Sequence, residues 1–156
     1  MERIEHQKRA VTYNGRVIYE WDQTLDEINF YTAAPPGISA KEIVCKIQPT
    51  KLTLGAAAAA RPFIDEELYG KANVSESLWT LEDGVIHVTV SKAKPGEVWL
   101  AFLKSHAPAN PGDKAMLEQT IRKELMLERF QRENAGFDFS GATFNGTAPD
   151  PNNFLS

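Results

Sequence analysis

The sequence has only one cysteine in 156 residues and contains no long apolar run. A single cysteine excludes an internal disulfide framework and fits a reducing compartment. No apolar stretch approaches the ~20 residues that a membrane-spanning helix requires. The segment from Met1 to His6 is charged and lacks the apolar centre of a secretory signal. We therefore expect a cytoplasmic or nuclear protein that makes no contact with membranes.

Basic runs are also missing. Lysine and arginine number 17 against 21 aspartate and glutamate residues, which gives a net charge of −4. A nucleic-acid surface would need a basic stripe or patch. We therefore expect no nucleic-acid partner.

Catalytic and metal-binding patterns are scarce as well. The histidines His6, His87 and His106 lie far apart in the sequence, so they form no metal-binding cluster. No phosphate-binding loop, dinucleotide-binding glycine pattern or nucleophile-elbow motif occurs. The acidic residues at 65–67 and 82–83 are explained better by a charged edge and a turn than by acid–base catalysis. We expect a protein that is not an enzyme and needs neither a metal nor a cofactor.

The segment 76–90 has the clearest local pattern. Two runs of alternating residues flank Asp83-Gly84. Asp-Gly tolerates the positive backbone angles of a two-residue turn, so the segment predicts a β-hairpin. The rows that face one side are Ser77, Trp79 and Leu81 in the first strand and Ile86, Val88 and Val90 in the second.

Similar short runs occur between residues 16 and 105, separated by turn signals such as Pro35-Pro36-Gly37. Their spacing, without helical periodicity, predicts an all-β domain over residues 16–105, with about seven or eight short strands in an antiparallel β-sandwich and one of the strands at 98–102. Residues 1–15 are predicted to be a flexible arm, or an arm laid on the sheet. The other inward rows are Val17, Tyr19 and Trp21; Ile28 and Phe30; Ile43, Cys45 and Ile47; and Leu52 and Leu54.

The pattern also predicts the burial or exposure of individual side chains in these strands. Trp79 and Trp99 lie in alternating rows and are predicted to be core residues, whereas Trp21 ends a strand and is predicted to be partly exposed. Cys45 is interpreted as a small core residue and not a nucleophile, because apolar surroundings suppress the thiolate. His87 falls on the polar face of its strand and is expected to be solvated.

Residues 110–135 are predicted to form a helix. Asn110 can cap its start, Pro111 suits the first helical position, and Gly136 can follow its end. Glutamate–arginine pairs four residues apart, at 118/122 and 128/132, support the helix. One apolar stripe consists of Leu117, Ile121 and Leu125. The apolar surface is wider than this stripe, and two alternatives remain open: the helix packs with one face only, or the second face docks a partner.

Without a catalytic pattern, exposed aromatic and lysine side chains are the natural candidates for binding another protein, since aromatic groups bury much area for little entropy loss. Residues 136–156 are a tail with four phenylalanines, of which two are expected to be held against the rest of the chain. The predicted partner-binding residues are Trp21, Gln23, Lys41, Lys46 and Lys92 in the sandwich and Leu127, Phe130, Phe137 and Phe139 near the carboxyl end.

Several motifs of the sequence occur together in one known family. They are Trp21 to Glu27, Pro35 to Gly37, Leu68 to Gly70, Glu76 to Gly84, Lys92, Leu127 to Asn134 and Gly136 to Ala142. Together they resemble the CS domain of NudC-type nuclear-movement proteins, from about residue 17 to 145, and the run Trp-Thr-Leu-Glu-Asp-Gly is specific for that family. The alanine run at 56–60 departs from the family, which has a glycine- and lysine-containing loop there.

The resemblance implies a seven-stranded antiparallel β-sandwich like that of the small acidic co-chaperones, without enzymatic activity. It further implies a co-chaperone of the ninety-kilodalton heat-shock chaperone, with β-propeller (WD-repeat) proteins or the LIS-type regulator of cytoplasmic dynein as clients. The chain lacks the long amino-terminal coiled-coil region of full NudC, so it resembles the short NudC-like branch. Microtubules are then a further expected location, and a monomer or weak homodimer is expected.

Two functions fit these expectations. The first is an adaptor that binds a folded chaperone or propeller client through the sandwich and the terminal helix. The second is a stand-alone holdase that binds unfolded proteins in the manner of a small heat-shock protein.

Overall fold

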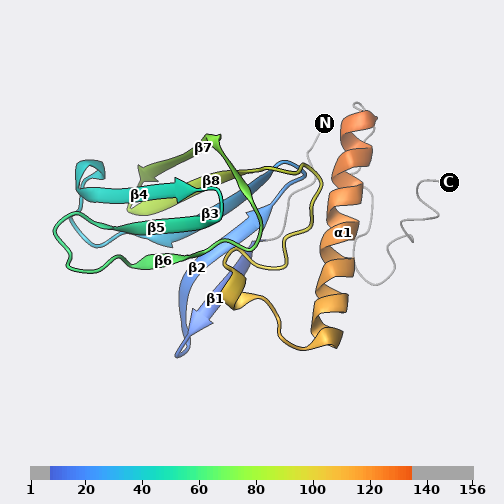
Figure 1. Ribbon diagram of the computed structural model, residues 1–156, viewed down its shortest axis with the longest axis horizontal. Coiled ribbons are helices and arrows are strands. Elements are labelled where there is room, and N and C mark those ends of the chain that lie inside the picture. The colour runs from blue at the N-terminus through green and yellow to red at the C-terminus, as the bar shows by residue number, and fades with distance from the viewer. Residues whose placement is uncertain (1–7, 135–156) are drawn as a thin grey trace.

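The computed structural model describes residues 8–134, which form two antiparallel β-sheets packed face to face and a long helix across one end (Figure 1). The larger sheet has the order β1 (Arg9–Tyr13), β2 (Arg16–Gln23), β3 (Glu27–Ala33), β8 (Val85–Lys92) and β7 (Ala72–Glu82). The smaller sheet has the order β4 (Ile43–Gln48), β5 (Lys51–Ala56) and β6 (Ile64–Glu67). The other elements are the 3₁₀ turns η1 (Ala40–Glu42) and η2 (Lys104–His106) and helix α1 (Pro111–Glu133). The predicted β-sandwich is confirmed, with eight described strands instead of seven.

The predicted hairpin is formed by β7 and β8. Asp83 and Gly84 have φ angles of 49° and 75°, as both central residues of a type I′ turn require. This turn sets the register, so that Leu81 pairs with Ile86 across the two strands. The twist of such a turn matches the twist of the strands, and the hairpin is therefore specified locally.

The amino-terminal segment differs from the prediction. Residues 9–13 form β1 and pair with β2, so the flexible-arm prediction is wrong for them and the alternative, an arm laid on the sheet, is right. The missed signal is Asn14-Gly15, whose φ angles of 52° and 76° make another two-residue turn. Arg9 also reaches the helix, where its Nη2 donates to Glu124 Oε2 at 3.1 Å.

Most of the core between the sheets comes from the predicted inward rows, but the inward prediction is wrong for Val17, which is 58% exposed near the start of β2. Phe30 is fully buried and stacks on Phe102, with ring centroids 4.6 Å apart. The ring centroids of Tyr19 and Phe30 are 4.9 Å apart. Burying each large apolar side chain contributes about 1.5–3 kcal/mol. The other core residues with 0% exposure in the strands are Ile28, Leu52, Leu54, Ile86, Val88 and Val90.

The predicted strand at 98–102 is wrong, because the segment is irregular in the structure. Its side chains are nevertheless buried, and Trp99 and Phe102 have no exposed surface. A continuous apolar run has the same pattern in a buried strand and in a buried crossing segment, so periodicity cannot separate the two. Gly70 lies so close to Trp99 that an added Cβ would be 2.6 Å from the indole ring.

The remaining side-chain expectations have mixed outcomes. Trp99 is a core residue as predicted, whereas Trp79 is half-buried and packs at the margin of the core. The expected exposure of Trp21 is wrong, since only 3% of this residue is exposed. Cys45 is half-buried against the core, and burial raises the pKa of its thiol to about 11, which fits the interpretation as a packing residue.

Helix α1 begins and ends close to the predicted residues. Asn110 Oδ1 accepts hydrogen bonds from the backbone N–H groups of Gly112 and Asp113 at 2.7 and 3.3 Å. The stripe residues Ile121 and Leu125 are buried in a second, smaller core with Leu25, Leu100 and the partly buried Leu117. No helix in the part of the chain that the structure describes is long and apolar enough to cross a membrane.

We expect the change Phe30→Ala to lower the free energy of unfolding by about 3–5 kcal/mol, because it leaves a cavity beneath the aromatic stack. Urea denaturation followed by tryptophan fluorescence measures the change. Leu78→Ala is the matched control: Leu78 is 55% exposed on β7, and its loss should change stability by less than about 0.5 kcal/mol. Equal effects of the two changes would contradict the assigned core.

Candidate functional site

A buried lysine lies where the sandwich meets the helix. Lys92, at the end of β8, is 3% exposed and donates from Nζ to three oxygens. These are Gln23 Oε1 at 3.1 Å, the Thr24 carbonyl at 2.7 Å and the Glu97 carbonyl at 2.6 Å. A buried cation is tolerated when such acceptors replace its hydration, so Lys92 ties the end of β2 to the loop after β8.

Gln23 completes this junction. Its Nε2 donates to the Trp99 carbonyl at 2.7 Å, and its Oε1 accepts from the Trp99 backbone N–H at 3.1 Å. Gln23 is 2% exposed. The Gln23 side-chain amide therefore makes the two backbone hydrogen bonds at Trp99 that a neighbouring strand would otherwise make.

The prediction that Trp21, Gln23 and Lys92 are exposed anchors for a partner is wrong. All three side chains are buried. The sequence did contain the signal: Gln23 continues the inward period of two from Trp21, and Lys92 continues that of β8 from Val90. We assigned the polar side chains to the outside because lysine and glutamine are seldom fully buried.

Opposing effects act on the pKa of Lys92. Burial lowers it, because the charged form loses its hydration, and the negative charges of Glu128, Glu97 and Asp26 oppose this effect but are smaller. The net result is a pKa of about 8, below the ordinary 10.5. The pKa of Lys92 therefore depends on α1, because Glu128 lies on that helix.

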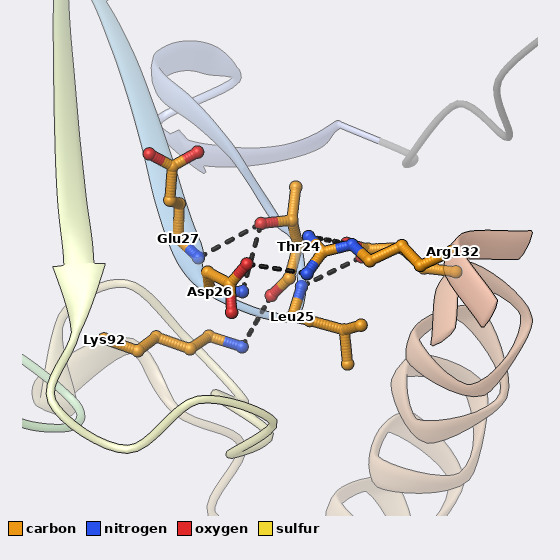
Figure 2. Close-up of polar contacts among 7 residues, drawn as sticks. Thr24, Leu25, Asp26, Glu27, Lys92 and Arg132 are labelled. Atoms are coloured by element: carbon orange, nitrogen blue, oxygen red, sulfur yellow. Dashed lines mark hydrogen bonds and ion pairs between the residues drawn. The ribbon is translucent and has the colours of Figure 1, made fainter. Parts of the chain in front are cut away.

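The turn 24–27 between β2 and β3 fastens α1 to the sandwich (Figure 2). Thr24 Oγ1 accepts from the backbone N–H groups of Asp26 and Glu27 at 3.3 and 3.0 Å, which fixes the turn. Glu128 Oε1 accepts from the Leu25 N–H at 2.9 Å. Arg132 then bridges the two elements, since Nη1 donates to Asp26 Oδ2 at 2.7 Å and Nη2 donates to Glu128.

The predicted binding residues near the carboxyl end have different positions. Leu127 is buried, so it is not the exposed anchor that we predicted. Phe130 is half-buried, and its role in binding stays a prediction. Phe137 and Phe139 lie outside the described residues.

Two predicted residues do lie at the surface of the smaller sheet. Lys41 in η1 and Lys46 on β4 are both exposed. Lys46 pairs with Thr53 on β5, which in turn pairs with Asp65 on β6. Asp65 is bonded to Thr53 Oγ1 at 3.0 Å and to Lys51 Nζ at 2.9 Å. The lysines are therefore available for a partner, and their binding role stays a prediction.

The outer face of the larger sheet carries a set of polar side chains that the sequence reasoning missed. We call Asp22, Asn29, Tyr31, His87 and Thr89 the polar row. Asn29 is its centre: Nδ2 donates to Asp22 Oδ1 at 2.8 Å, and Oδ1 lies 3.0 Å from His87 Nε2 and 3.3 Å from Thr89 Oγ1. The register of β2, β3 and β8 brings Asp22, Asn29 and Thr89 side by side.

The polar row is more enclosed than its position on an outer face suggests. Tyr31 stacks on His87 with ring centroids 4.5 Å apart, so the expected solvated histidine is half-buried instead. The Nζ of Lys8 lies 4.0 Å above the Tyr31 ring. Burial raises the pKa of Tyr31 to about 12, and Asp22 adds to the effect. A neutral hydroxyl and a set of linked amide and imidazole groups suit recognition by hydrogen bonding.

Among residues 8–134, no cluster of three or more His, Cys, Asp or Glu side chains could hold a metal ion.

Comparison with known proteins defines the class to which this fold belongs. The CS-domain family model matches residues 17–92. The solution structure of a human CS domain is similar with a TM-score of 0.51 and 24% identity, covering 69% of this chain and 91% of that domain. The sandwich is therefore a CS domain.

Relatives then identify the particular family. NudC domain-containing protein 2 of Rattus norvegicus is 35% identical over 130 residues, which cover 81% of this chain and 79% of that protein. The nuclear migration protein nudC of Drosophila melanogaster is 25% identical over 161 residues, with 81% of this chain and 48% of that protein covered. The chain belongs to the NudC family of CS-domain proteins.

We expect Lys92→Met to lower the free energy of unfolding at neutral pH by about 1–3 kcal/mol, because it leaves buried oxygens without a donor. Since the folded-state pKa of Lys92, about 8, lies below the ordinary 10.5, the unfolded chain binds more protons between these pH values. The wild-type stability should therefore rise relative to that of the variant from about pH 8 to 10.5, and this gain is lost as the pH falls through 8. Urea denaturation across this range measures both effects.

Lys46→Met is the matched control, because Lys46 is exposed on β4. It should change stability by less than about 0.5 kcal/mol at every pH. A Lys92→Met protein as stable as the wild type, with a parallel pH dependence, would show that Lys92 is not held as described.

We expect Glu128→Ala to weaken the attachment of α1 and to lower the free energy of unfolding by about 1–3 kcal/mol, since the buried Leu25 N–H loses its acceptor. Thermal denaturation followed by circular dichroism measures the loss. Glu118→Ala is the control, because Glu118 pairs with Arg122 on the exposed side of the same helix. The attachment described here fails if both alanine variants melt alike.

Proposed function

We propose that this chain acts as a non-enzymatic co-chaperone or adaptor of the NudC type that assists the ninety-kilodalton heat-shock chaperone. Its clients would be β-propeller proteins or the regulator of cytoplasmic dynein. Its location would be the cytoplasm, with the nucleus or microtubules as further sites. The chain would act as a monomer or a weak homodimer.

The observation that carries this proposal is the extent of the family similarity. The CS-domain match ends at residue 92, whereas the rat relative covers 81% of the chain. The shared part thus exceeds the CS domain alone. Because α1 is tied to the sandwich through Glu128 and Arg132, the two would present one continuous surface to a partner.

The exposed surfaces support binding of a transient kind. The polar row offers linked hydrogen-bonding groups on the larger sheet, and Lys41 and Lys46 offer positive charge on the smaller one. Polar surfaces of limited area are typical of transient complexes, for which we expect a Kd in the micromolar range.

We expect isothermal titration calorimetry of the purified chain with the ninety-kilodalton chaperone to show saturable binding. The double change Lys41→Glu and Lys46→Glu should weaken binding several-fold, because it reverses the charge of an exposed surface. Lys94→Glu is the control, since Lys94 is exposed in the loop after β8. It should leave the affinity unchanged within about twofold.

An aggregation assay with a heated, unrelated protein distinguishes the two functions that the sequence leaves open, adaptor and holdase. An adaptor should not prevent its aggregation without the chaperone. Suppression of that aggregation, together with no saturable binding to the chaperone, would replace the adaptor by the holdase.

A further inference from the structure

The sandwich has a cavity on one of its open sides. Contacts between β4 and β7 close the sandwich at one side. At the other side β6 is the last strand of its sheet, and a cavity of about 470 Å³ lies between β6 and the facing strands β2 and β3. Its apolar lining includes Ile18, Ala33, Leu54, Phe63, Ile64 and Leu103.

The cavity suits an apolar group. Its volume falls in the range of about 300–1,000 Å³ that is typical of ligand pockets. Phe63 and Ile18 remain 50% and 42% exposed at the cavity, although both are large and apolar. A ligand that covered them would remove this surface from water, which favours an aliphatic or aromatic group as the occupant.

The polar end of the cavity is acidic. The Tyr19 hydroxyl and His106 Nδ1 share a hydrogen bond of 2.7 Å, and Glu66 Oε1 accepts from Ser105 Oγ at 3.2 Å. The pKa of Tyr19 lies above its ordinary value, first because the hydroxyl is buried and then because of the negative charge of Glu66. The carboxylate thus acts on the interior of the cavity, where it would favour a cation.

Strand β6 offers a main-chain edge beside the cavity. Among the strands that the structure describes, it pairs with β5, and the bond from Leu68 N–H to the Thr50 carbonyl, 2.9 Å, continues the same register. The other side is covered at the carboxyl end of β6, because Leu68 bridges Leu103 and η2 contacts β6. Main-chain groups alternate in direction along an antiparallel strand, so those of Ile64 and Glu66 face β5, while those of Asp65 face away from it on the part of the edge that η2 leaves open. Such an edge can accept an added strand.

The charges of this edge select the partner. Asp65, Glu66 and Glu67 are consecutive and exposed, while within residues 8–134 two lysines pair with them, Lys51 with Asp65 at 2.9 Å and Lys104 with Glu67 at 3.6 Å. A second copy of the chain would bring the same acidic strand and a net charge of −4, and would be repelled. A basic segment would be attracted.

We propose that the open side of the sandwich binds an extended basic peptide segment of a client. The segment adds to β6 as a strand, inserts one aliphatic or aromatic side chain into the cavity, and places lysine or arginine opposite the acidic residues of β6. This inference rests on the proposed function, because the peptide is assigned to a client. The two can fail separately, since peptide binding is measured without the chaperone.

The test uses the whole chain and a short, blocked synthetic peptide that alternates lysine and leucine, with binding followed by fluorescence anisotropy. We expect saturable binding that Phe63→Ala and Glu66→Lys each weaken by about tenfold, whereas chaperone binding by these variants is unchanged. The matched controls are Leu78→Ala and Glu76→Lys on the edge strand β7, which change an exposed apolar and an exposed acidic residue away from the cavity. They should bind the peptide like the wild type.

Two altered peptides test the mode of binding. Replacement of lysine by glutamate should abolish binding, and N-methylation of alternate backbone amides should also abolish it, because the methyl groups block strand addition. The proposal is overturned if either peptide binds as well as the original, or if Phe63→Ala and Glu66→Lys bind like the wild type. Sedimentation that shows a dimer held through β6 would overturn it as well, since a second copy would then be the occupant.

Discussion

The arrangement of sandwich and helix depends on a positive charge held inside the protein. A buried ammonium group is destabilising unless acceptors replace its water, and Lys92 has three oxygens from two separate segments of the chain. One of these segments is the turn that receives Glu128 and Arg132 from α1. The strand, the turn and the helix are therefore joined by polar contacts around Lys92. The small apolar cluster around Leu125 also holds the helix, so that apolar and polar contacts position it together.

Local patterns in the sequence were sufficient for much of the fold. The Asp83-Gly84 turn, the rows that contain Phe30 and Val88, and the cap at Asn110 are each specified by neighbouring residues, and each is confirmed. For β1 the sequence left two alternatives, a flexible arm or an arm laid on the sheet, because a polar segment with few apolar residues gives a weak alternation; the Asn14-Gly15 turn indicates the second.

The site could be predicted less well, because it depends on contacts between distant segments. Whether Gln23 is an anchor or an internal bridge depends on where residues around Trp99 pass, some 76 positions along the chain. The polar row requires the register of three strands, of which only β2 and β3 are consecutive. The cavity arises from the gap between two sheets, and no spacing in the sequence encodes it. Lys46 was placed correctly at the surface because period-two alternation and charge agree on β4, and Lys41 is exposed in the turn η1.

The order of the strands also constrains how the chain can reach this structure. Every pairing between described strands joins consecutive strands except that of β3 with β8. This pairing encloses the whole of the smaller sheet in a single loop, so it carries the greatest loss of chain entropy on closure. Contacts of high sequence separation form slowly for this reason. We therefore expect the hairpins to form early. The pairing of β3 with β8, which joins the two parts of the larger sheet, is expected to be the rate-limiting step of folding.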